Sequence, residues 1–166
     1  MIKKIMITVN NKENIMRFES ARDVLKHTKE FHLQLRELFE LLVKQESIPR
    51  RKLLLEYMIS QEKSLVESLH HFEKNTPSGV LDIWLQYAND EAILKVPDIE
   101  VFQSKKSMND ILELSIKMSD KLIEVYKLVE DQVDDNKVKE IFNNLADMQM
   151  QKQRRLTMNF DRLMDI

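Results

Sequence analysis

The chain has 166 residues, 33% of them charged, and its formal net charge of −2 at pH 7 predicts no special attraction to nucleic acid or to an anionic membrane. One glycine and three prolines leave few turn formers, which is typical of proteins built from long helices. The absence of cysteine excludes disulfides, thiolate metal sites and cysteine nucleophiles.

Residues 1–18 precede the first predicted helix and are interpreted as an N-terminal arm. Ile5, Ile7 and Val9 fall on alternate positions, which predicts a short extended segment that packs along the helices or on another subunit. The apolar run is too short for a signal peptide, and no other run approaches the ~20 residues of a membrane span. We therefore expect a cytoplasmic protein that makes no use of a membrane.

Two long helices are predicted in the first half of the chain, near residues 19–46 and 49–74. Ser20 and Asp23 have the spacing of a capping box, and Pro49 suits the first turn of the second helix. Residues spaced by three and four indicate one buried face on each helix. These faces comprise Val24, Thr28, Phe31, His32, Leu35, Phe39 and Leu42, and then Leu54, Met58, Gln61, Glu62, Leu65, Leu69 and Phe72.

The region 74–106 interrupts this pattern and is interpreted as a crossover. Turn-forming residues at 75–79 predict the end of the second helix, with Gly79 as its C-cap. The length of the region suits a connection that returns along the whole preceding helix, about 40 Å at 1.5 Å per residue.

Two further long helices are predicted near residues 107–133 and 135–163, separated by the turn formers Asp134, Asp135 and Asn136. Their expected buried faces comprise Ile111, Ser115, Met118, Ser119, Leu122, Val125, Tyr126 and Val129, and then Ile141, Leu145, Met148, Gln149, Lys152, Leu156 and Phe160.

The two halves of the chain repeat each other. A shift of 87 positions lays residues 20–73 on 107–160 without a gap, so that Ser20 falls on Ser107 and Leu69 on Leu156. We therefore predict one all-α domain over 1–166, with helical hairpins at 20–73 and 107–163 joined by the crossover at 74–106. Four long helices with one long connection make a ferritin-like four-helix bundle.

The second hairpin also resembles a known family. Ile-Glu-Val-Tyr at 123–126, Val-Lys-Glu-Ile-Phe at 138–142 and Leu-Ala-Asp at 145–147 are similar to the rubrerythrin branch of the ferritin-like superfamily. The repeat extends the resemblance to residues 20–163, without the crossover. It implies two metal ions held by one glutamate on each of the first and third helices and by Glu-x-x-His on the second and fourth.

Carried onto this chain, that metal site is degenerate. The glutamate positions of the first and third helices hold His32 and Ser119, and the two Glu-x-x-His pairs hold Glu62 with Leu65 and Gln149 with Lys152. One carboxylate and one imidazole do not offset two divalent ions, so we expect no bound metal, no cofactor and no catalytic residue. The lack of cysteine also excludes the iron-binding rubredoxin module that many rubrerythrins carry.

Two charged residues on the predicted core faces need an explanation, because a buried unpaired charge costs several kcal/mol. In one interpretation Glu62 and Lys152 pair across the bundle, with His32 and Gln149 hydrogen-bonded nearby, and replace the metals. In the other, both side chains lie at the margin of the bundle and extend to water.

The leading functional hypothesis is a non-catalytic ferritin-like bundle that acts as a binding or scaffold protein, as a homodimer. One alternative is a metal-binding oxidoreductase with an atypical site that uses His32 and Glu62. The other is a small-molecule binder that uses the former metal cavity.

Overall fold

The regular secondary structure in residues 20–85 and 107–165 is helical. The computed structural model describes residues 20–85 and 107–165, and within these ranges the one β-type pairing is an isolated bridge between Ser20 and Trp84. The long helices are α1 (Ala21–Gln45), α2 (Pro49–Asn75), α5 (Met108–Gln132) and α6 (Asn136–Met164), and α3 (Ser78–Leu81) is a single short turn. The predicted all-α class is confirmed. The predicted arm at 1–18 and residues 86–106 of the predicted crossover lie outside the described residues.

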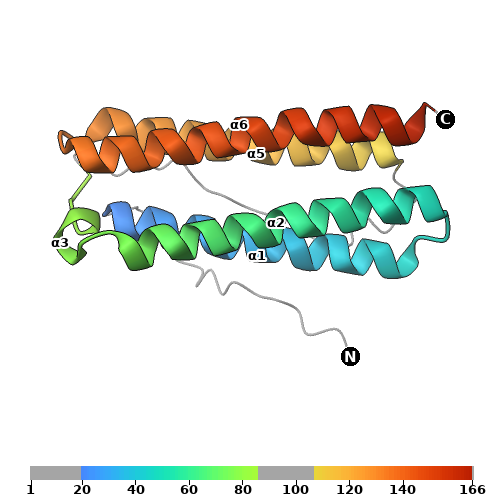
Figure 1. Cartoon of the computed structure of the whole chain (residues 1–166), viewed down its shortest axis with the longest axis horizontal. Helices are drawn as coiled ribbons and strands as arrows, with labels where there is room; N and C mark the ends of the chain where they lie inside the picture. Colours follow the sequence, from blue (N-terminus) through green and yellow to red (C-terminus); the bar gives the residue numbers. More distant parts are fainter. Residues whose placement is uncertain (1–19, 86–106, 166) are drawn as a thin grey trace, which may run out of the picture.

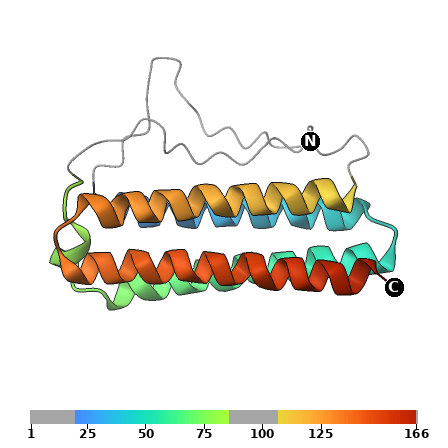
Figure 2. The ribbon, with the colours of Figure 1, turned by 90° about the horizontal axis from the view of Figure 1, so that it is seen from above.

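The four long helices lie side by side as two antiparallel hairpins. Figure 1 shows α5 and α6 next to each other above α1 and α2, and Figure 2, turned by 90°, shows α5 over α1 and α6 over α2. In Figure 1, α2 ends at the left end of the bundle, whereas α5 begins at the right end. The chain therefore passes from one end of the bundle to the other between these two helices.

The helix boundaries follow the 87-residue repeat. α1 and α5 each have 25 residues and begin directly after Ser20 and Ser107, and Pro49 of α2 corresponds to Asn136 of α6. Both predicted capping boxes are formed: the Ser20 hydroxyl accepts a hydrogen bond from the Asp23 backbone N–H, and Ser107 and Asp110 do the same. Local sequence therefore determines where these helices begin, since the caps satisfy N–H groups that lack a helical partner.

The prediction of Gly79 as the C-cap of the second helix was wrong. α2 continues to Asn75 and ends at Thr76, whose backbone N–H and hydroxyl both donate to the Phe72 carbonyl, at 3.0 Å and 2.6 Å. Thr76 keeps an extended backbone with φ of −87°, so no left-handed residue is required. Pro77 then prevents continuation of the helix, and Gly79 lies within α3.

The interior of the bundle is formed by the predicted faces of all four long helices. Every position predicted for the first and third helices is buried, whereas Gln61, Phe72, Ile141 and Met148 on the second and fourth are half-buried. No helix in the described ranges is long and apolar enough to cross a membrane.

Candidate functional site

Polar side chains in the bundle interior gather at equivalent positions of the two hairpins. In the described part of the chain the buried polar or charged residues are Thr28, His32, Glu62, Ser115, Ser119, Gln149 and Lys152. Under the 87-residue shift six of them form the pairs 28/115, 32/119 and 62/149, and Lys152 corresponds to Leu65, which is buried as well. The six positions predicted for a former metal site are therefore all in the core.

These residues form a layer because they lie at matching heights in their hairpins. His32 lies thirteen residues before the end of α1 at Gln45, and Glu62 lies thirteen after the start of α2 at Pro49. Ser119 and Gln149 have the same offsets from Gln132 and Asn136 in the second hairpin. Because helices rise 1.5 Å per residue, His32 and Glu62 lie at one level of the first hairpin, and Ser119 and Gln149 lie at one level of the second. We call these residues, together with Lys152 and with Thr28 and Ser115 one helical turn away, the polar layer.

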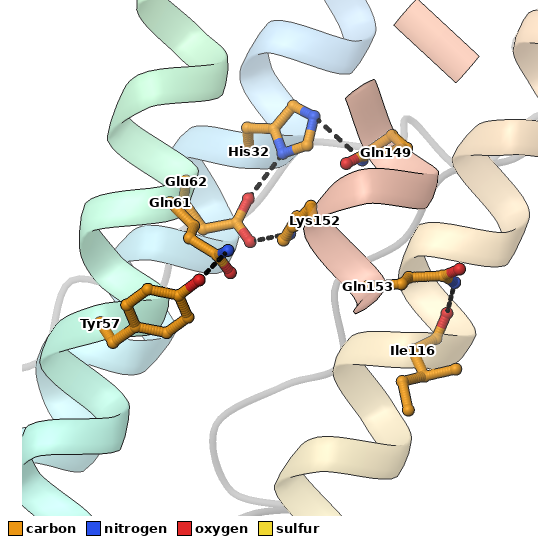
Figure 3. A network of polar contacts seen from close by, with 8 residues as sticks. All are labelled: His32, Tyr57, Gln61, Glu62, Ile116, Gln149, Lys152 and Gln153. Atoms are coloured by element: carbon orange, nitrogen blue, oxygen red, sulfur yellow. Dashed lines mark hydrogen bonds and ion pairs between the residues drawn. The ribbon is translucent and has the colours of Figure 1, made fainter. Parts of the chain in front are cut away.

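Glu62 is the centre of the polar layer. Its Oε1 accepts a hydrogen bond and ion pair from Lys152 Nζ, and its Oε2 lies 2.6 Å from His32 Nδ1. Figure 3 shows His32 and Lys152 approaching the two carboxylate oxygens from different helices. Lys152 is only 6% exposed and Glu62 is fully buried, so the predicted charge pair is confirmed and the alternative of two side chains extending to water is wrong.

The surroundings keep Glu62 ionised. Burial alone raises the pKa of its carboxyl, but the charge of Lys152 and the hydrogen bond from His32 outweigh burial, and the net pKa is below its ordinary value. The ammonium of Lys152 balances this negative charge. Both carboxylate oxygens then have a partner, as a buried charge requires.

His32 is neutral in this arrangement. Burial lowers the pKa of its imidazole, and Lys152 lowers it further, although Glu62 acts in the opposite direction. Since an ionised carboxylate only accepts, Nδ1 carries the proton and donates to Glu62. Nε2 is then an acceptor, and the Gln149 side-chain N–H donates to it at 3.5 Å, the outer limit for a hydrogen bond.

A contact between Thr28 and Tyr126 was missed by the sequence analysis. Both residues were predicted to face the core, but no bond between them was predicted. Burial raises the pKa of the Tyr126 phenol above its ordinary value, and the Thr28 hydroxyl acts in the opposite direction. The available signal was that the repeat partner of Tyr126 is Phe39, so one half of the layer has a hydroxyl that the other lacks.

The donors present do not fit a dinuclear metal centre. Among residues 20–85 and 107–165 no group of three or more His, Asp or Glu side chains is placed to hold an ion. Glu62 is the one carboxylate at the six positions, and Lys152 and His32 already occupy its two oxygens. A divalent ion would have to displace the ammonium and would then lack carboxylates to neutralise it.

Comparisons of the chain with models of protein families, with curated proteins and with solved structures find no match.

The lowered pKa of His32 predicts a pH dependence of stability. The unfolded chain takes up a proton at this residue near pH 6.5, whereas the folded protein does so only at lower pH. The stabilisation is thus fully present above about pH 7 and is lost as the pH falls below about 6.5, with a slope that approaches 1.4 kcal/mol per pH unit. The variant His32→Asn, which keeps an N–H donor for Glu62, is expected to have a shallower slope between about pH 7 and pH 5.5.

Urea denaturation at a series of pH values measures this slope, and only slopes are compared, because the substitution also changes the packing. The matched control is His70→Asn at an exposed position of α2. Equal slopes for the parent protein and His32→Asn would show that His32 does not contribute.

Proposed function

We propose that this protein is a ferritin-like bundle of the rubrerythrin-like branch in which a salt bridge has replaced the dinuclear metal site. We propose further that it acts as a non-catalytic binding or scaffold protein and forms a homodimer. The directions of the four long helices and the number of residues between α2 and α5 support the ferritin-like part of this proposal. The agreement of helix boundaries under the 87-residue shift also supports this proposal.

The observation that carries the proposal is the contact of Lys152 with Glu62 at the former ligand positions. A metal site of this type uses cations to neutralise buried carboxylates. Here one ammonium neutralises one carboxylate, so the bundle needs no metal for charge balance. The buried pair has no open coordination position at which a substrate or dioxygen could react.

Elemental analysis tests this proposal. We expect protein produced in medium supplemented with iron and manganese, and purified without a chelator, to contain far less than one metal ion per chain. A content of about two iron or manganese ions per chain would overturn the proposal and favour an oxidoreductase with an atypical site.

A further inference from the structure

The two halves of the polar layer differ in how well their polar atoms are paired. On the side of α1 and α2, the carboxylate of Glu62 and the hydroxyl of Thr28 each have protein partners. On the side of α5 and α6, Ser115 Oγ and Gln149 Oε1 form no hydrogen bond with any residue in the described ranges. Both atoms belong to side chains that are at most 1% exposed, so bulk water does not reach them.

Burial without a partner is costly for these two groups. An unpaired buried hydroxyl or carbonyl costs about 1–3 kcal/mol, and native interiors usually satisfy such groups with protein or with ordered water. The repeat counterpart of Ser115 is Thr28, whose hydroxyl donates to the Leu25 carbonyl at 3.1 Å, whereas Ser115 Oγ has no corresponding bond. Nothing in residues 20–85 or 107–165 therefore compensates for the burial of Ser115 Oγ.

The side chains on this side of the layer are also small. Ser119 occupies the position at which the first hairpin has the imidazole of His32, and Ser115 lacks the extra methyl of Thr28. Lys152 extends toward Glu62 on α2, as Figure 3 shows. One water molecule takes up about 30 Å³ in the liquid, and a buried water needs two to four polar partners.

We infer that the polar layer binds a buried water molecule between α5 and α6, held by Gln149 Oε1 and Ser115 Oγ. The water donates one hydrogen bond to the Gln149 carbonyl and exchanges another with the Ser115 hydroxyl. Lys152 supplies a third partner, since its ammonium has three donors and gives one of them to Glu62. This site does not depend on the ferritin-like proposal, because it follows from the unpaired atoms themselves.

The water links the two hairpins through a continuous polar chain. Lys152 and Gln149 already join α6 to Glu62 on α2 and to His32 on α1. With the water in place, Ser115 connects α5 to the same network. All four long helices are then linked in one buried hydrogen-bonded layer, which specifies their mutual register more tightly than apolar packing does.

A high-resolution crystal structure of the full chain tests the inference directly. We expect density for one water within about 2.7–3.2 Å of both Gln149 Oε1 and Ser115 Oγ. Density for a larger molecule, a dry interior, or a direct protein partner for both atoms would each overturn it.

The variant Ser115→Ala gives an independent test in solution. If the water is bound, removal of the hydroxyl breaks its coordination, and the melting temperature is expected to fall by about 2–4 °C relative to the control, which corresponds to about 1 kcal/mol in a protein of this size. If Ser115 Oγ is dry and unpaired, the same change removes a costly group and raises the melting temperature. The control is Ser64→Ala at an exposed position of α2, which has the same gain in helix propensity.

Discussion

Replacement of Lys152 by methionine is expected to lower the free energy of unfolding by roughly 3 to 5 kcal/mol, because it leaves the buried Glu62 carboxylate without its counter-charge. The change Glu62→Gln is expected to cost a similar amount, since the Lys152 ammonium then loses the carboxylate that it contacts. The double variant should have a stability close to that of the parent protein, because an uncharged pair of similar volume has no desolvation cost to offset. The four proteins form a double-mutant cycle with a coupling energy of several kcal/mol.

Urea denaturation followed by far-UV circular dichroism measures all four free energies. The half-buried pair of Lys29 with Glu73, at 2.8 Å between α1 and α2, provides the control cycle. Its coupling energy should be below about 1 kcal/mol, because water screens it and competes for its charges. Small and additive effects at Glu62 and Lys152 would contradict a buried pair and would mean that the two side chains reach solvent.

Restoration of the six ligand types is expected to restore metal binding. The variant that keeps Glu62 and contains His32→Glu, Leu65→His, Ser119→Glu, Gln149→Glu and Lys152→His has four carboxylates and two imidazoles in the layer. Two divalent cations offset four carboxylates, whereas the present chain has one carboxylate and one ammonium. We expect about two iron or manganese ions per chain, and a melting temperature that rises with metal concentration.

The matched control has the same substitutions except that Lys152 is retained, so that an ammonium remains where the second imidazole is needed. We expect it to bind less metal than the complete set. Both variants are refolded in the presence of Mn²⁺, because four buried carboxylates repel one another in the absence of metal. A complete variant that folds but binds no metal, or that does not fold even with Mn²⁺, would show that these positions do not converge on one site.

Several features of the fold were predictable because they depend on residues close together in the chain. The capping boxes of Ser20 and Ser107 define the starts of α1 and α5, and Pro49 begins α2. The spacing of apolar residues identified the buried faces. The end of α2 was predicted less well, since the hydroxyl of Thr76 caps the last turn and makes a glycine in the left-handed region unnecessary.

The candidate site was predictable in its members but not in its geometry. The repeat places His32, Glu62, Ser119 and Gln149 at equivalent positions, and their helical spacing directs them to the core. Sequence patterns alone left two arrangements for Glu62 and Lys152, a buried pair and two exposed charges. The spacing of core residues indicates which face of a helix is buried, but not how far a long side chain extends along it.

The sequence by itself therefore determined the all-α class, the starts of the helices, the hairpin repeat and the set of polar residues in the core, since these follow from local capping and from helical periodicity. The tertiary structure decided which of these polar groups meet. Lys152 and Glu62 are ninety residues apart, and their contact depends on the packing of α6 beside α2. The same packing leaves Ser115 Oγ and Gln149 Oε1 without a hydrogen-bond partner in the described ranges.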